Sequence, residues 1–143
     1  MKRVLIPAAV GALGLFVALS ALGPSTDTRR TTIGAFQIVQ TVLADSSTTH
    51  VPEGDARQAS VAAFAQLRPD LKGMTVSAAN FAAGVAKATS TNGFIFSTGN
   101  PVNVWLVEAS GPAQAGWDHV IGLAIVDATS GRVLASGIGA YND

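Results

Sequence analysis

The sequence predicts an α+β fold, with one N-terminal hydrophobic helix followed by one small domain in which a helix packs on an antiparallel sheet. Three observations predict it: residues 4–22 are uncharged and apolar, residues 55–68 show apolar residues at helical spacing, and the last fifty residues alternate between apolar and polar. A chain of 143 residues holds one ordinary domain and a targeting segment. We therefore divide it into a signal peptide or membrane anchor (1–23), a linker or juxtamembrane segment (24–50) and an α+β domain (51–143).

The N-terminal segment is typical of export. Lys2 and Arg3 precede nineteen uncharged residues, and Ala18-Leu19-Ser20 fits the small-x-small rule for cleavage before Ala21. The alternative is a retained membrane anchor, because nineteen helical residues nearly cross a bilayer core about 30 Å thick. Both interpretations place the domain outside the cytoplasm of a bacterial cell, either secreted or attached to the membrane through residues 4–22.

The stretch between residues 24 and 50 allows two interpretations. Ile33, Phe36, Val39 and Leu43 recur at near-helical spacing, which favours a juxtamembrane amphipathic helix. Alternatively, the Arg29-Arg30 pair before an apolar stretch fits a twin-arginine signal, with a second cleavage site at residues 42–44. Residues 45–50 form a Ser/Thr-rich connector, in which we expect the His50 ring to be solvated.

The domain begins with a predicted helix from about Asp55 to Arg68, with acidic residues in its first turn. The next segment, residues 73–90, is ambiguous. It fits a strand starting at Met74, or a second helix capped by Ser77 with Phe81, Val85 and Ala88 on one face.

The C-terminal part is predicted to be β-rich. A short strand over residues 94–96 is followed by a turn at residues 99–101, and then by strands over 102–109, 120–126 and 132–136. The last two strands should form a hairpin through residues 127–131. Asp127 would accept backbone N–H groups in this turn, and Gly131 should have a positive φ.

The hairpin sequence Val126-Asp127-Ala128-Thr129-Ser130-Gly131-Arg132-Val133-Leu134 resembles the closing signature of PepSY-type domains. The strand Val104-Trp105-Leu106-Val107 before it, and the helix over residues 55–68, match the order of that family. The resemblance implies a cystatin-like arrangement of a helix on an antiparallel sheet. It also implies a regulatory or inhibitory role without shared catalytic residues.

Charge and composition argue against several functions. From Asp45 onward the chain has five basic and eight acidic residues and no basic stripe, so nothing indicates a nucleic-acid interface. The chain has no cysteine, which excludes disulfides and thiolate chemistry. His119 and Asp118 are adjacent, but neighbours on a strand point to opposite faces. We therefore predict no catalytic, cofactor-binding or metal-binding residues.

Two functions remain. The first is an exported, non-enzymatic interaction or regulatory module with an unknown extracytoplasmic protein partner, using Trp117, Gln114 and Asp118 in a Gly/Pro-rich loop as its contact surface. The second is a small ligand-binding or isomerase-like cone domain with a pocket acid, for which Glu108 in an apolar strand is the candidate. A closed apolar cavity around Glu108 or Asp118 would favour the second.

Overall fold

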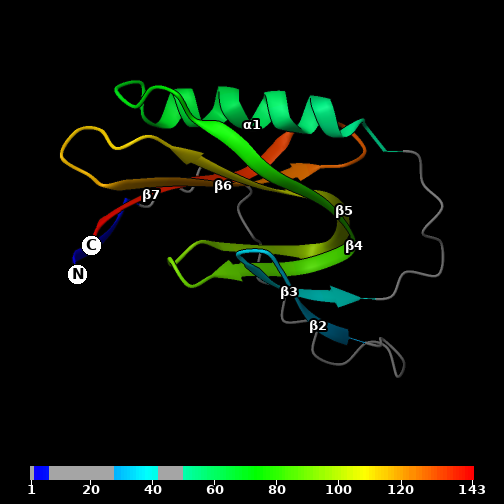
Figure 1. Ribbon diagram of the computed structural model, residues 1–143. Coiled ribbons are helices and arrows are strands. Elements are labelled where there is room, and N and C mark those ends of the chain that lie inside the picture. The colour runs from blue at the N-terminus through cyan, green and yellow to red at the C-terminus, as the bar shows by residue number, and fades with distance from the viewer. Residues whose placement is uncertain (1, 7–27, 42–49) are drawn as a thin grey trace.

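In the computed structural model, residues 2–6, 28–41 and 50–143 are described. They form one seven-stranded antiparallel sheet in the order β1-β7-β6-β5-β4-β3-β2, and one helix that covers part of it (Figure 1). The strands are β1 (Lys2–Ile6), β2 (Thr28–Ile33), β3 (Phe36–Thr41), β4 (Thr75–Ser90), β5 (Ile95–Gly111), β6 (His119–Asp127) and β7 (Val133–Asn142), and the helix is α1 (Glu53–Leu67).

The predicted fold class is wrong, because the protein is mostly sheet and its N-terminus does not begin a hydrophobic helix. Residues Lys2–Ile6 form strand β1, which pairs antiparallel with β7 from Lys2↔Asn142 to Ile6↔Ile138. β-branched Val4 and Ile6 favour extended backbone, and the edge of β7 provides the hydrogen-bonding partners. Residues 7–22 lie outside the described residues. No helix within the described ranges has the length and hydropathy needed to span a membrane.

The helix predicted around residues 33–43 is also wrong, because residues 28–41 form the hairpin β2–β3, joined to the sheet through β4. Phe36 and Ile38 are buried and Gln37 between them is exposed, which is the two-residue period of a strand. Gly34, with φ +58°, forms the turn that separates the two strands. The proposed cleavage site at residues 42–44 lies outside the described residues.

Helix α1 confirms the predicted helix to within two residues at each end. Its buried face carries Ala56, Ser60 and Phe64, and the hydroxyl of Ser60 donates a 2.8 Å hydrogen bond to the Ala56 carbonyl. The helix lies on one face of β7, β6, β5 and β4 and closes the first core (Figure 1). The buried members of this core are Ala56, Phe64, Leu71, Trp105, Val107, Ala109, Val120, Ala124, Val126, Ala128, Ile138 and Ala140.

The contact between Phe64 and Gly122 sets how closely the helix approaches the sheet. A Cβ atom at Gly122 would lie 2.9 Å from both Cε1 and Cζ of the Phe64 ring. Since carbon atoms in contact prefer separations of about 3.5–4.0 Å, only glycine fits beneath this ring. Phe64 is 1% exposed, so the ring has little space into which it can move.

Strands β4 and β5 bend sharply halfway along their length, so that the far part of the sheet folds beneath the near part (Figure 1). The bend coincides with irregular pairing, because Ala82 pairs with Val104 but Val85 pairs with Val102. Gly84 has φ +63° in this bulge, and its N–H donates a 3.0 Å hydrogen bond to Oδ1 of Asn103. Bulges bend a strand and raise its twist, which is the effect seen here.

The bend closes a second core on the face of the sheet opposite the helix. Its buried members are Phe36, Ile38, Ala82, Val85, Ala88, Phe96, Val104, Leu106, Leu123, Ile125 and Ala135. Phe94, at the tip of the β4–β5 hairpin, packs edge-on against Phe36 with ring centroids 5.9 Å apart. It also reaches the backbone of β7, where a Cβ at Gly137 would lie 3.3 Å from its Cδ2. The hairpin tip thus lies against the opposite end of the same sheet.

Strand β4 settles the ambiguity of residues 73–90, because Thr75–Ser90 is one strand and the alternative helix is wrong. The predicted turn at residues 99–101 is wrong as well. Residues 98–101 stand in β5 opposite the single residue Ala86, so they form a bulge within one long strand.

The predicted final hairpin is confirmed, because β6 pairs with β7 and Gly131 has φ +76°. Oδ1 of Asp127 accepts the N–H groups of Thr129 and Ser130.

We expect Gly122→Ala to lower the free energy of unfolding by about 1–3 kcal/mol, because the new methyl group would displace the Phe64 ring in a packed core. In a chain that carries Phe64→Leu, the same substitution should cost less, because the clashing ring is gone. Denaturant unfolding of the two single variants and the double variant measures this coupling.

The matched control is Gly54→Ala in the first turn of α1, where an added Cβ meets nothing within 4 Å. It should leave stability unchanged or raise it by up to about 1 kcal/mol. If Gly122→Ala were as stable as the original chain, the close approach of helix and sheet would not be a constraint.

Candidate functional site

The loop that carries the predicted contact residues is a tight two-residue turn. The N–H of Gln114 donates to the carbonyl of Trp117, and the N–H of Trp117 donates to the carbonyl of Gln114, each at 3.0 Å. Ala115 and Gly116 between them both have positive φ, at 53° and 82°. This is the backbone conformation of a hairpin turn with two left-handed residues, and it places Trp117 directly before β6.

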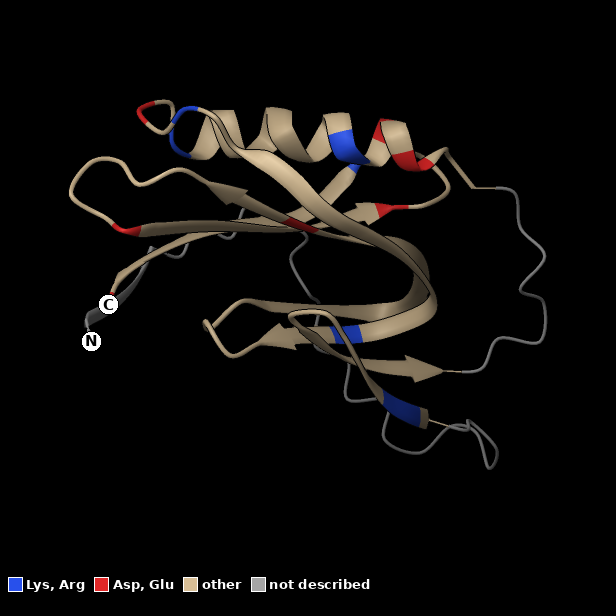
Figure 2. Ribbon diagram, viewed as in Figure 1, with Lys and Arg blue, Asp and Glu red and all other residues tan. Residues whose placement is uncertain are grey.

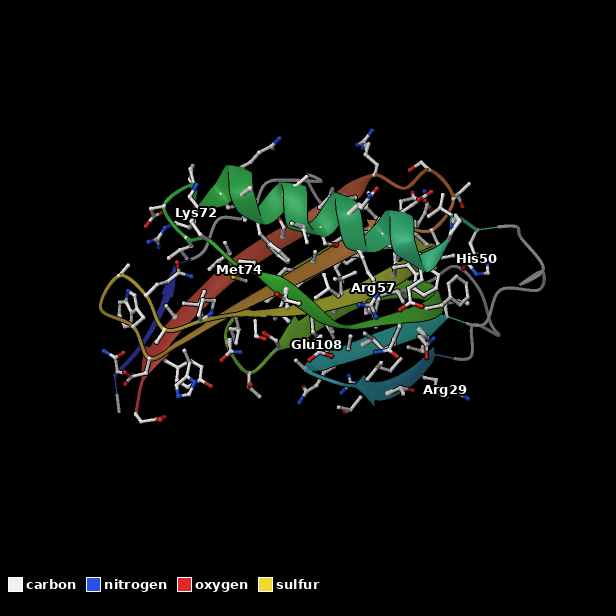
Figure 3. The ribbon with its side chains drawn as sticks, turned by 45° about the horizontal axis from the view of Figure 1, so that its top comes forward. Arg29, His50, Arg57, Lys72, Met74 and Glu108 are labelled. Carbon is white, nitrogen blue, oxygen red and sulfur yellow. The ribbon has the colours of Figure 1, made fainter. Side chains whose placement is uncertain are left out.

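Gln114 has a structural role that the sequence did not indicate. Its side chain accepts a 2.9 Å hydrogen bond from the N–H of Lys72 at Oε1 and donates a 2.8 Å hydrogen bond to the carbonyl of Lys72 from Nε2. The amide thus links the loop to the connection between α1 and β4, where Lys72 lies near one end of the helix (Figure 3). Both ends of the amide are engaged, which leaves little of it for a partner.

Trp117 and Asp118 are the members of the predicted surface that remain accessible. Trp117 is half-buried and packs against the first core. Asp118 is exposed; its N–H donates a 2.8 Å hydrogen bond to Oδ1 of Asn142, and its Oδ2 accepts one from the N–H of Asp143 at 3.3 Å. The loop and the end of β7 thus form one continuous acidic edge of the molecule.

His119 interacts with the end of the chain. Its Nε2 lies 2.9 Å from Oδ2 of Asp143, and its ring stacks on Tyr141 with centroids 4.6 Å apart. His119 and Tyr141 are direct cross-strand partners in β6 and β7, which explains the stacking. Both members of the His119–Asp143 pair are well exposed to solvent, at 43% and 76% of the side chain. The arrangement is a surface contact between strand ends.

Glu108, the candidate acid of the alternative function, is half-buried on β5 between Ala78 of β4 and Leu123 of β6. Its carboxylate lies directly against Gly34 in the β2–β3 turn, where a side chain on that residue would overlap it. Figure 3 shows Glu108 below the helix, between the near and far parts of the sheet. The neighbouring interior is occupied by the apolar side chains of the second core.

A hollow of about 350 Å³ lies on the outer face of the far part of the sheet. It is open to solvent and is lined by Arg30, Thr31, Thr32, Gln37, Ile38, Val39, Lys87 and Thr89. The basic residues Arg29, Arg30 and Lys87 are the charged residues within 28–41 and 85–101. Figure 2 shows this part of the ribbon with blue segments and no red ones, whereas the acids lie on the near part and the helix.

His50 is exposed, as predicted, and its ring also contacts aromatic residues of the sheet. It stacks on Phe81, with ring centroids 4.6 Å apart, and lies 5.6 Å from the Trp105 ring. Trp105 is 8% exposed, and its Nε1–H donates a 3.1 Å hydrogen bond to the carbonyl of Val51. The N–H of Val51 donates in turn to Ala128 at 2.7 Å. These contacts fix the chain immediately before α1. Because Trp105 is buried in the first core and binds this segment, it is a core residue and not a contact residue.

The described residues contain no group of three or more His, Asp or Glu side chains placed to hold a metal ion. Comparisons of the chain with models of protein families, with curated proteins and with solved structures found no match.

Arg68 and Asp70 form a two-bonded ion pair where α1 ends. Nε and Nη2 of Arg68 donate to Oδ1 and Oδ2 of Asp70 at 2.9 and 2.7 Å. The hydrogen bonds from Arg68 lower the pKa of the Asp70 carboxyl group from its ordinary 3.8 to about 2, and they raise the pKa of Arg68. The pair closes the loop that also carries Lys72, the partner of Gln114.

We expect the Asp70 carboxyl to titrate near pH 2 in an NMR titration of the folded protein, and Arg68→Met to return its pKa toward 3.8. Because the folded pKa is depressed, the pair's contribution to stability is present above about pH 4 and is lost as the pH falls toward 2. The control is Arg57→Met, which should leave the Asp70 titration unchanged, because Arg57 pairs with Glu53 and not with Asp70. An Asp70 midpoint that is the same with and without Arg68→Met would show that the pair does not form in solution.

Proposed function

We propose that this protein is an exported, non-enzymatic interaction module that binds another protein outside the cytoplasmic membrane. One observation carries the proposal: within residues 28–41 and 50–143, every Asp, Glu, His, Lys, Arg and Tyr side chain is at least partly exposed. The buried polar side chains there are Ser60 and Ser136. Both faces of the sheet are used for apolar packing, by the helix on one side and by the folded-back strands on the other.

This distribution argues against the alternative of a cone-shaped ligand-binding or isomerase-like domain. Acid–base catalysis by a carboxyl group at neutral pH relies on an environment that raises its pKa, such as an apolar pocket that a substrate can enter. Glu108 lies instead against the backbone of the β2–β3 turn, and the adjacent core is filled by residues such as Leu106 and Leu123. A binding protein needs no such pocket, because its contacts are made on the outer surface.

Three further observations support the proposal. Lys2 and Arg3 followed by an uncharged apolar stretch are typical of an export signal. The resemblance of residues 101–112 and 119–137 to PepSY-type domains implies a regulatory role outside the cytoplasm. The accessible part of Trp117 beside exposed Asp118 combines an aromatic group with a charge, as contact surfaces commonly do. We therefore place the contact surface at the loop before β6 and the acidic edge next to it.

Export is tested by introducing charged residues into the apolar stretch of residues 4–22. Leu13→Arg with Leu15→Arg should retain the full chain in the cytoplasm, because each arginine costs about 2.5–3.5 kcal/mol at the centre of an inserting segment. The matched control is Leu13→Ile with Leu15→Ile, which keeps the segment apolar and should be exported. The measurement is protease digestion of a C-terminal tag in intact spheroplasts. Equal protection of the tag in both chains would contradict the proposed export.

Partner binding is tested by photo-crosslinking in the native envelope, with benzoylphenylalanine in place of Trp117. We expect one discrete adduct, weakened by Asp118→Lys through reversal of charge. The control has the same group in place of Val61, which is 39% exposed and belongs to α1 and not to the loop. Turnover of a small-molecule substrate by the purified protein, abolished by Glu108→Gln, would overturn the proposed function in favour of an enzyme.

A further inference from the structure

Strand β1 occupies an edge of the sheet with residues that also belong to the predicted export signal. Lys2–Ile6 pairs with Asn142–Ile138 of β7 in unbroken antiparallel register. The same five residues contain the basic start of the export signal and the first part of its apolar stretch. A segment that is inserted in a membrane, or removed by cleavage, cannot also pair with β7.

Export therefore leaves the outer edge of β7 without its strand. The backbone N–H and C=O groups of residues 138–142 that face β1 would then lack partners, and such an edge is a template for another strand. The opposite edge is less receptive, because β2 carries the exposed cations Arg29 and Arg30, and charged side chains on an edge strand disfavour pairing.

We propose that the edge of β7 is a strand-acceptor site for an extended segment of a partner protein, with basic residues at its amino end followed by apolar residues. The segment would add to the sheet in the place and direction of β1, in the mode in which peptides extend a sheet edge. This inference rests on the proposed export and names the chemistry of the partner. In the unexported chain, Lys2–Ile6 keeps the site closed.

The chemistry of the partner follows from the register and from the charges around the edge. Lys2 and Arg3 pair with Asn142 and Tyr141, at the end of β7 that is flanked by the exposed carboxylates of Asp118 and Asp143. A basic residue at this position of an added strand is therefore attracted to the site. Further along, Gly139 presents no side chain, which leaves room for a large apolar residue opposite it.

The same charges argue against a second copy of this chain as the partner. Two β7 strands could pair with each other in antiparallel fashion about a two-fold axis. However, Val133–Asn142 contains no lysine or arginine, so a second β7 would bring no positive charge to Asp118 and Asp143. A dimer through β7 is the outcome against which the proposal is tested.

The first measurement establishes the pairing in the purified full chain by disulfide trapping. The natural chain has no cysteine, so Val4→Cys with Ala140→Cys introduces a single possible bond between residues that stand directly opposite in the sheet. Cross-strand pairs lie at separations that a disulfide spans. We expect this pair to oxidise, and the out-of-register control Val4→Cys with Leu134→Cys to remain reduced. Failure of the first pair to oxidise would overturn the proposal.

The second measurement opens the edge with one proline and uses the adjacent proline as its control. Neighbouring residues of a strand direct their N–H groups to opposite edges. One of Val4→Pro and Leu5→Pro therefore removes an N–H group that bonds to β7, and this variant is the opened chain. The other removes an N–H group that faces solvent, and it is the control chain. The probe is a fluorescein-labelled peptide, acetyl-Lys-Arg-Val-Leu-Ile-amide. By fluorescence anisotropy, the opened chain should bind it about tenfold more tightly than the control chain, because the competing strand is weakened.

Two further samples make the result specific. The oxidised Val4→Cys/Ala140→Cys chain should not bind the probe, and a peptide with both basic residues replaced by glutamate should bind the opened chain about tenfold more weakly. Equal affinity of the probe for both proline variants, or binding to the oxidised chain, would overturn the acceptor site. Dimerisation of the opened chain in place of peptide binding, seen by light scattering, would reject a foreign strand in favour of a second copy.

These measurements use purified protein and do not require export. If the protein is exported but does not bind the probe, this inference is wrong and the proposed function stands. If the protein binds the probe but remains in the cytoplasm with its signal intact, the proposed function is wrong.

Discussion

The bend in β4 and β5 is the constraint on which the rest of the structure depends. The two strands span residues 75–90 and 95–111, too long to pack flat beneath one helix of fifteen residues. The bulge at Gly84, held by the side chain of Asn103, turns the far ends back beneath the sheet. Without the bend, the apolar residues of the face opposite the helix, among them Leu106 and Ile125, would be exposed to water.

The bend also determines which residues remain available for function. Because the sheet covers its own second face, the residues enclosed there are mainly apolar, and every ionisable side chain of residues 28–41 and 50–143 is at least partly exposed. The charged residues of the far part are basic, whereas the acids lie on the near part and the helix, together with other basic residues (Figure 2). The polar groups available for contacts therefore lie on loops and strand ends, such as the loop at Trp117 and the end of β7.

The two ends of the sheet differ in the kind of edge they present. On one side, arginines on β2 protect the edge by charge. On the other side, β7 is covered by five residues of the same chain that also have the features of an export signal. The proposed export would therefore couple the position of the N-terminus to the exposure of the β7 edge, with no change needed in the rest of the sheet.

The sequence by itself determined the elements whose signals are local. Helix α1 follows from the spacing of Ala56, Ser60 and Phe64. The β6–β7 hairpin follows from Asp127 and Gly131, because the backbone geometry of the turn requires those residue types.

The tertiary structure alone decided three features. Ala82, Val85 and Ala88 share a face at helix-like intervals because bulges change the alternation of β4. Residues 28–41 are strands because β4 offers them a free edge. Gln114 belongs to the scaffold because Lys72, 42 residues away, binds both ends of its amide. Each of these depends on hydrogen-bonding partners distant in the chain, which local spacing does not encode.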